Sequence, residues 1–275
     1  MQKKYSKSFD GAKIFYHKTQ NDPKKWLIFL HGLGGDLTAW EKERRYFDHL
    51  GISTLAIDLR GHGLSERGKN KNFYKLKNHI YDVKVILEKE QIQKPVIVGH
   101  CFGGMVSINY GAYFPREVDA LVLVDTSYKL PFFSKHKTCA IFLENILEQL
   151  AKISPERHIE RHTHFKNFYD TSDVDFRRLL SDVLHASIKS YLFLCSNLIE
   201  YDAESLLKKI VDPTLVVEGT RDSIFPPKIA ALLKERLINS EMDLIPEANH
   251  ILIINSPKEL NQTIDSYLKK ISFLK

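Results

Sequence analysis

The chain has 275 residues, of which 43% are hydrophobic and 27% charged, and its formal net charge is +6 at neutral pH. This length and balance suit one large globular α/β domain, with or without an inserted subdomain, and they exclude a disordered or fibrous chain. The positive charge does not indicate a nucleic-acid partner, because Lys and Arg are interspersed with Glu and Asp and no nucleic-acid-binding motif is present.

The chain also has the features of a protein from a reducing compartment. Apolar runs such as 26–30 are far too short to cross a bilayer, and the first residues lack the apolar stretch of a secretion signal. Cys101, Cys139 and Cys195 are too few and too widely spaced for a disulfide framework or a CxxC metal site. We therefore predict a cytoplasmic protein without stable membrane insertion, and the sequence leaves its oligomeric state open.

The elements predicted from the pattern begin with a hairpin: alternating stretches at 3–9 and 12–18 are joined by Asp10 and Gly11, a strong turn signal. Short apolar runs then alternate with segments whose apolar residues recur at helical spacing. The predicted buried strands are 26–30, 53–59, 95–99, 119–125, 213–219 and 241–248. The predicted helices are 37–49, 72–90, 102–113, 226–238 and 257–271. This alternation predicts an α/β protein with a mostly parallel, doubly wound sheet.

The rhythm changes between residues 127 and 207, where no comparable strand run is visible. Helical patterns at 139–153 and 175–201 predict a helical insertion there, so that 1–126 and 208–275 form the core domain. We expect Cys139 and Cys195 to pack inside this insertion. His158 and His162 are four residues apart, which favours a surface helix, and two histidines without a third ligand make a poor zinc site.

The stretch Val98 to Gly104, VGHCFGG, places Cys101 between a predicted strand and a predicted helix. Gly99 and Gly103 flank it, as a tight strand-to-helix turn requires, because a Cβ at either position collides with its neighbours. Such a turn lifts residue 101 above the sheet, and the N-terminus of the following helix favours a thiolate. Cys101 is therefore a candidate nucleophile, and the alternative is a small buried residue that only fills space.

A nucleophile of this kind needs a base, and the base needs an acid to orient it. Asp222 follows the predicted strand 213–219, and His250 follows the predicted strand 241–248. The carboxyl ends of parallel strands meet at one edge of the sheet, so the three side chains are expected to converge. The order nucleophile, acid, histidine predicts a triad of Cys101, Asp222 and His250.

These motifs, together with HGLGG at 31–35 and DLRGHGLS at 58–65, resemble the α/β-hydrolase fold family, in the group with a helical cap or lid. The resemblance implies a sheet of about eight strands with a cap at 127–207. It also implies that the main-chain N–H groups of Leu33 and Phe102 form an oxyanion hole. Most relatives carry serine where this chain has Cys101, and a minority carry cysteine. A serine replaced by engineering is an open alternative.

The resemblance and the triad together imply a carboxylic ester or thioester hydrolase that works through a covalent acyl-enzyme, without cofactor or metal. The expected partner is a small acyl ester or thioester, hydrophobic because the insertion is rich in aromatic residues. Those residues are Phe132, Phe133, Phe142, Tyr169, Tyr191 and Phe193. Two alternatives stay open, an acyltransferase that uses the same triad and a ligand-binding member of the fold without catalysis.

Overall fold

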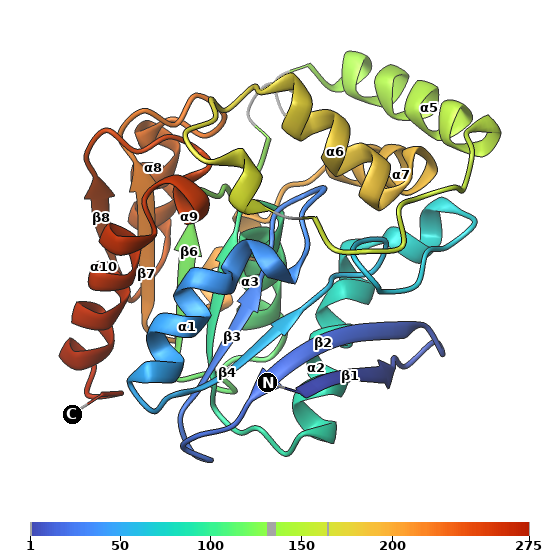
Figure 1. Cartoon of the computed structure of the whole chain (residues 1–275). Coiled ribbons are helices and arrows are strands. Elements are labelled where there is room, and N and C mark those ends of the chain that lie inside the picture. The colour runs from blue at the N-terminus through green and yellow to red at the C-terminus, as the bar shows by residue number, and fades with distance from the viewer. Residues whose placement is uncertain (1, 131–135, 164, 275) are drawn as a thin grey trace.

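The computed structural model describes residues 2–130, 136–163 and 165–274, and it contains one eight-stranded sheet of order β1-β2-β4-β3-β5-β6-β7-β8 (Figure 1). The strands are β1 (Gln2–Lys7), β2 (Lys13–Thr19), β3 (Trp26–Leu30), β4 (Ser53–Ile57), β5 (Val96–His100), β6 (Ala120–Val124), β7 (Thr214–Gly219) and β8 (Ser240–Ile245). The pairs β1–β2 and β2–β4 are antiparallel and all the others are parallel. The predicted fold class and the hairpin are confirmed.

Helices cover both faces of the sheet. One face packs against α2 (Leu76–Lys89), α3 (Phe102–Tyr113) and α8 (Pro227–Arg236). The other packs against α1 (Glu41–His49), α9 (Leu252–Asn255) and α10 (Pro257–Lys270). The short 3-10 helices η1 (Leu37–Trp40) and η2 (Lys71–Tyr74) precede α1 and α2.

The central strands are largely apolar because both faces of the sheet are covered. All five residues of β3 are buried, and successive side chains point to opposite faces. Leu27 and Phe29 belong to the core beneath α1 and α10, whereas Ile28 and Leu30 belong to the core beneath α2 and α3. Two hydrophobic cores thus hold the sheet rigid from both sides, which gives the loops at its edge a fixed base.

The segment between β6 and β7, residues 127–207, is called the cap segment below. Its described part contains α5 (Lys137–Ile153), η3 (Phe165–Phe168), α6 (Phe176–Ala186) and α7 (Ile188–Leu198), and η4 (Glu204–Lys209) leads back to β7. In Figure 1 these helices lie across the top of the sheet, where the parallel strands end. The two ends of the segment lie side by side, because Lys129 and Asp202 form an antiparallel bridge.

Two expectations about the helices of the cap segment are wrong. The pattern 175–201 predicts one helix, but the chain breaks at Ser187, whose φ is +74°, and α6 and α7 are separate. The segment around His158 and His162 is not a helix; the described part of 154–163 has no regular structure. Across the described chain, no helix is long and apolar enough to span a membrane.

Candidate active site

The nucleophile turn has the strained backbone that its glycines suggest. Cys101 lies between the end of β5 and the start of α3 with φ +49° and ψ −112°. A Cβ on Gly103 would lie 2.2 Å from the carbonyl oxygen of Leu30, and a Cβ on Gly99 would lie 2.4 Å from the carbonyl oxygen of Gly103. Both positions therefore accept only glycine, and the turn presents Cys101 at the N-terminus of α3.

Asp222 and His250 come together beside this turn. The Nδ1 atom of His250 lies 2.6 Å from Oδ2 of Asp222, and both residues are buried. Oδ1 of Asp222 accepts hydrogen bonds from the main-chain N–H groups of Ile224 (2.6 Å) and Phe225 (2.8 Å). The carboxylate is thus held by its own loop and turned toward the imidazole, which leaves Nε2 of His250 for Cys101.

The surroundings of His250 favour the charged form of its imidazole. Burial opposes the charged form of His250, but the Cys101 sulfur, to which it is hydrogen bonded, and the Asp222 carboxylate outweigh burial and raise the pKa of His250 well above its usual value. Burial also opposes the charged form of Asp222, yet the hydrogen bond and the charge of His250 lower its pKa overall. The structure thus places Cys101, His250 and Asp222 next to one another, with a hydrogen bond between His250 and Asp222.

The loop that contains Leu33 lies against the nucleophile turn. A Cβ added to Gly32 would be 3.3 Å from the Cβ of Cys101. Phe102 is the first residue of α3, so its N–H has no acceptor within the helix. The two amides expected to form an oxyanion hole therefore belong to adjacent backbone segments.

Two buried histidines fix this loop and explain the motifs HGLGG and DLRGHGLS. Nε2 of His31 accepts a hydrogen bond from the N–H of Leu59 (3.0 Å), and Nε2 of His62 accepts one from the N–H of Gly34 (3.1 Å). Burial lowers the pKa of His31 to about 4 and the pKa of His62 well below its usual value. Both rings are therefore neutral and able to accept, so they hold the loop as structural residues.

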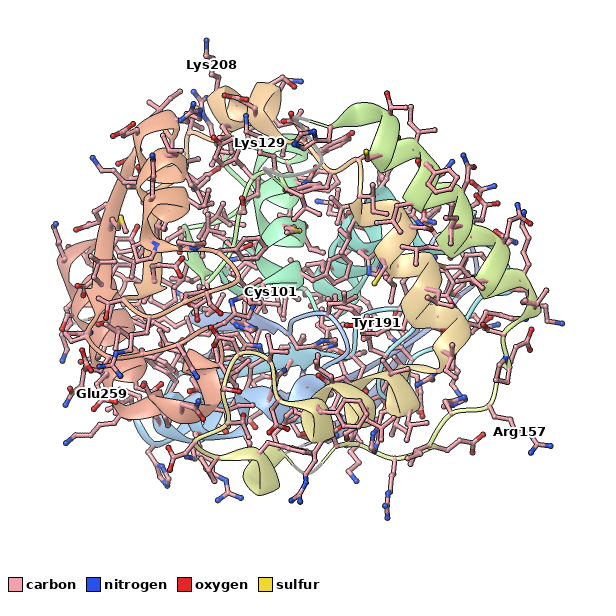
Figure 2. All side chains as sticks on the ribbon, turned by 90° about the horizontal axis from the view of Figure 1, so that it is seen from above. Cys101, Lys129, Arg157, Tyr191, Lys208 and Glu259 are labelled. Atoms are coloured by element: carbon pink, nitrogen blue, oxygen red, sulfur yellow. The ribbon has the colours of Figure 1, made fainter. Side chains whose placement is uncertain are left out.

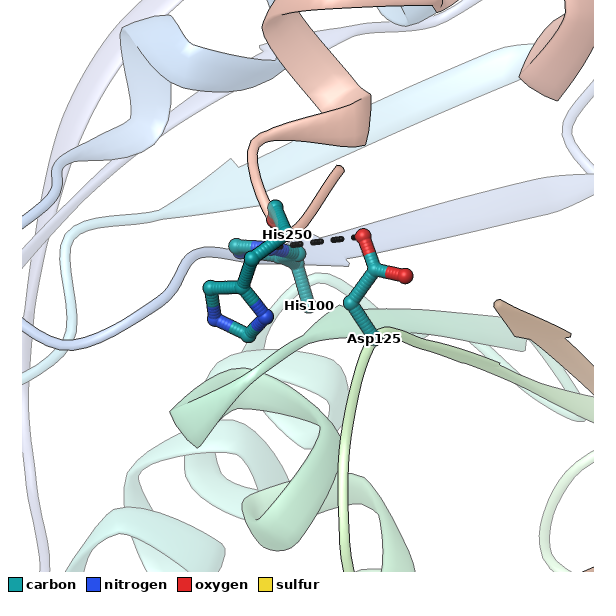
Figure 3. A group of neighbouring side chains, drawn as sticks. All are labelled: His100, Asp125 and His250. Atoms are coloured by element: carbon teal, nitrogen blue, oxygen red, sulfur yellow. Dashed lines mark hydrogen bonds and ion pairs between the residues drawn. The ribbon is translucent and has the colours of Figure 1, made fainter. Parts of the chain in front are cut away.

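His100 and Asp125 lie beside His250, as Figure 3 shows. Nε2 of His100 lies 2.9 Å from the carbonyl oxygen of His250 and 3.9 Å from Oδ2 of Asp125. These three residues have potential metal-ligand atoms within 4.8 Å of one another. However, Nδ1 of His250 is bonded to Asp222, so a metal at this place would have to break the hydrogen bond that orients the imidazole.

A second buried group contains the carboxyls of Asp125, Glu218 and Asp222, which also lie within 4.8 Å of one another. Burial, together with the charges of its two neighbours, raises the pKa of Glu218 far above its usual value. Burial raises the pKa of Asp125 to about 8. Three ionised carboxylates cannot share one dry site, so Glu218 and Asp125 are protonated at neutral pH, while Asp222 carries the charge.

The cap segment contributes polar side chains above the nucleophile. Tyr191 of α7 and Asp182 of α6 both lie next to Gly34, where an added Cβ would be 3.2 Å from the Tyr191 ring and 2.6 Å from the Asp182 Cβ. Figure 2, seen from above, shows Tyr191 beside the region of Cys101. Burial raises the pKa of Asp182 to about 7. The part of the cap segment that lies nearest the loop of Leu33 is therefore polar.

The other cap aromatics have different positions. Phe142 is 67% exposed and Tyr169 is 42% exposed, so neither roofs the nucleophile, whereas Phe193 is buried and stacks on Tyr74. Phe132 and Phe133 lie outside the described residues.

The expectation for Cys139 is wrong, because Cys139 lies exposed on α5. Cys195 is partly buried, and burial raises the pKa of its thiol to about 12.

Comparison with known proteins identifies the family. The model of the alpha/beta hydrolase fold matches residues 25–257. The chain is 24% identical over 247 residues to 3-oxoadipate enol-lactonase 2 of Acinetobacter baylyi, covering 90% of this chain and 89% of the relative. The chain belongs to the α/β-hydrolase fold family, and the protein is a hydrolase.

Solved structures show the same fold. The enol-lactonase from Burkholderia xenovorans LB400 aligns with a TM-score of 0.75 at 18% identity, covering 97% of this chain and 100% of that one. The esterase EaEST from Exiguobacterium antarcticum aligns with a TM-score of 0.73 at 18% identity, covering 98% and 100%.

Several residues around the site are absent from the sequence prediction. Glu218 had a signal, because it is a charged residue inside an otherwise apolar strand, and Asp125 had one, because it ends the strand 119–125. Tyr191 was named among the aromatic residues of the insertion, whereas Asp182 had no local signal, since helical periodicity does not show which face of a cap helix meets the sheet.

Proposed function

We propose that this hydrolase cleaves carboxylic esters or thioesters through an acyl-enzyme formed on Cys101, with His250 and Asp222 completing the triad. The observation that carries the proposal is the 2.6 Å bond between His250 and Asp222 beside a cysteine in a strained strand-to-helix turn. The esterases and enol-lactonases of the same fold support ester chemistry. The substrate would be a small acyl ester or thioester.

The reaction begins with the thiolate of Cys101, paired with the imidazolium of His250. Sulfur attacks the carbonyl carbon, a C–S bond forms, and the carbonyl electrons move onto oxygen, where the N–H groups of Leu33 and Phe102 stabilise the charge. As the tetrahedral intermediate collapses, the bond to the leaving alcohol or thiol breaks, and its heteroatom takes the proton from His250. The product of this half-reaction is a thioester on Cys101 and a neutral imidazole.

In the second half-reaction water attacks the acyl carbon and gives one proton to Nε2 of His250. Collapse of this intermediate breaks the C–S bond, releases the carboxylic acid and restores the thiolate–imidazolium pair. Asp222 holds the imidazole in one orientation throughout and stabilises its charged form. A thiolate is a better leaving group than an alkoxide, so the site suits thioesters, activated esters and transfer to an acceptor.

The decisive experiment is pre-steady-state turnover of p-nitrophenyl acetate and of acyl thioesters of graded chain length. We expect a burst of product equal to the enzyme concentration, which is lost in Cys101→Ala and His250→Ala. His49→Ala is the matched control, because His49 is exposed at the end of α1. Wild-type turnover in His250→Ala would remove that residue from the mechanism.

A Cys101→Ser variant addresses the origin of the cysteine. If thioester turnover falls in the serine variant, sulfur is the functional choice, whereas faster ester turnover by serine would favour a site built for an alcohol. Added alcohol or thiol acceptors, followed by product analysis, separate hydrolysis from acyl transfer.

The ligand-binding alternative predicts no special reactivity at Cys101. Alkylation by iodoacetamide and peptide mapping test this, because Cys139 is exposed and Cys195 has a pKa raised by burial to about 12. An acyl-transferring thiol should react faster than both. The cytoplasmic location and the division into a core domain and a cap at 127–207 stay predictions.

A further inference from the structure

A short stretch of the cap segment lies across both loops that hold the catalytic acid and base. The carbonyl oxygen of Thr171 accepts hydrogen bonds from the side-chain amides of Asn249 (2.9 Å) and Asn255 (3.0 Å), on either side of His250. Two residues later, Asp173 reaches the same region with its carboxylate. The cap is therefore bonded directly to the loop after β8, at the position of His250.

Asp173 joins the two catalytic loops. Its Oδ1 accepts a hydrogen bond from the main-chain N–H of His250 at 2.7 Å. Its Oδ2 accepts two from Ser223, one from the main-chain N–H at 2.8 Å and one from the hydroxyl at 2.6 Å. Ser223 is the neighbour of Asp222, so a single carboxylate bonds to the base's own backbone and to the residue next to the acid.

The contact continues to the oxyanion loop through α6. Nη2 of Arg178 donates to the carbonyl oxygen of Asp173 at 2.6 Å, and Nη1 donates to Oδ2 of Asp182 at 3.4 Å. Asp182 in turn lies next to Gly34. A series of three cap residues, Asp173, Arg178 and Asp182, thus connects the loop of His250 with the loop of Leu33.

We propose that Asp173 is a positioning residue that aligns His250 with Asp222. The alignment of the active site then depends on the contact between the cap segment and these two loops. The inference rests on the proposed function, because it assigns a role within the same triad. Asp173 bonds to the two loops and to neither reacting side chain, so it acts through their backbone positions.

The two loops need such a positioning residue because they follow different strands, and only the side-chain ends of His250 and Asp222 are bonded to each other. The His250–Asp222 bond fixes the distance between these two side chains, but the imidazole must also face the sulfur of Cys101. A charged acceptor that binds both backbones restricts the remaining motion, and a misplacement of about 1 Å costs on the order of a hundredfold in rate.

The test compares Asp173→Ala and Asp173→Asn with the wild-type protein. We expect Asp173→Ala to lower kcat about 10- to 100-fold while KM stays within about threefold, since alignment and not substrate affinity is lost. Asp173→Asn keeps the shape but replaces one acceptor oxygen with a donor, so we expect a smaller loss in kcat. Asn is also the variant that carries the test if the alanine protein fails to fold.

Two further variants serve as controls. Ser223→Ala removes one of the three bonds and leaves both main-chain bonds, so kcat should stay within about threefold of wild type. Asp170→Asn changes an exposed aspartate on the same loop and should leave kcat unchanged. Circular dichroism and thermal unfolding establish that each variant is folded before its kinetics are compared.

A second readout separates failure of this inference from failure of the proposed function. The rate at which iodoacetamide alkylates Cys101 needs the thiolate–imidazolium pair but no ester substrate. We expect it to fall about tenfold in Asp173→Ala and to stay at the wild-type value in Asp170→Asn. Absence of ester turnover in the wild type would reject the hydrolase proposal and leave this readout valid. A folded Asp173 variant with wild-type kcat and wild-type labelling would overturn the inference.

Discussion

His250 and Asp222 are 28 positions apart in the chain, yet the Nδ1 atom of His250 lies 2.6 Å from Oδ2 of Asp222. The bond brings together loops that follow neighbouring parallel strands, β7 and β8. The Asp222 carboxylate is the charged member of a group whose other two carboxyls have raised pKa values. The site therefore has one acid that can orient the imidazole at neutral pH.

This relationship predicts the effect of Asp222→Asn. The amide keeps the shape of the side chain but removes the charge that stabilises the imidazolium, so kcat should fall on the order of 10³- to 10⁴-fold. Steady-state kinetics with an activated ester at pH 7 measure the effect. Asp243→Asn, at an exposed position of β8, is the control and should keep wild-type kcat. A loss of less than tenfold in Asp222→Asn would show that another group orients His250.

The nucleophile turn predicts a large stability difference between two glycine variants. Gly103→Ala places a Cβ 2.2 Å from a main-chain oxygen, and rigid strands prevent the backbone from moving away, so we expect a loss of about 3 kcal/mol in the free energy of unfolding. Gly51→Ala meets no atom within 4 Å and has only the strain of φ +76°, so it should cost about 1 kcal/mol. Urea unfolding measures both, and equal losses would contradict the steric argument.

Glu43 predicts a pH-dependent stability that is unrelated to catalysis. It is buried on α1, neither carboxylate oxygen has a hydrogen-bond partner among the described residues, and burial raises its pKa from 4.5 to about 8. Because the folded protein holds the proton more tightly than the unfolded chain, the stabilisation is fully present below pH 4.5 and is lost as pH rises through 8.

A Glu43→Gln variant isolates this effect. It should be more stable than wild type by about 2 kcal/mol at pH 8.5 and equal to it near pH 4, since glutamine does not ionise. Urea unfolding across this pH range checks the prediction. A wild-type protein with the same pH slope as the variant would show that Glu43 reaches a partner or solvent.

The bond between His162 and Asp58 predicts that attachment of the cap to the core weakens at higher pH. Nε2 of His162 lies 2.8 Å from Oδ2 of Asp58. Burial and the positive charge of Lys3 oppose its charged form, but Asp58 and Asp36 outweigh them and raise the pKa of His162. The ion pair is therefore complete below the unfolded value of 6.5 and is lost as pH rises through the folded value.

Limited proteolysis of the cap segment between pH 5.5 and 9 measures this contact. Wild-type cleavage should become faster at the alkaline end, whereas His162→Ala should be cleaved quickly at every pH, with a difference of about 1 kcal/mol for a partly exposed pair. Cleavage that does not depend on pH in the wild type would contradict the assignment.

The fold of the core could be predicted from the sequence because the patterns that define its strands, helices and turns are local. The glycines around Cys101, the apolar strands that precede Asp222 and His250, and the parallel order of those strands place the three side chains at one edge of the sheet. The loop of Leu33 was identified through the resemblance of HGLGG to the α/β-hydrolase family, because its glycines alone do not distinguish it from an ordinary turn.

The cap was predicted less well because its structure depends on contacts between distant residues. Ser187 lies inside a continuous helical pattern, yet it breaks the helix, and its hydroxyl accepts a hydrogen bond from the N–H of Ser190 at 3.1 Å to begin α7. His162 lies outside any helix and contacts Asp58, which is 104 positions away in the sequence. Asp173 likewise bonds to residues 50 and 77 positions later, so no spacing in the sequence indicated its role.

The positive φ of Cys101 has an evolutionary consequence. The neighbouring glycines and the packing of β3, not the side chain itself, maintain this contorted conformation. A swap between thiol and alcohol at position 101 exchanges one atom and leaves those determinants intact. A single substitution can therefore exchange sulfur for oxygen at the nucleophile. The fold can be inherited unchanged while the chemistry of the nucleophile differs.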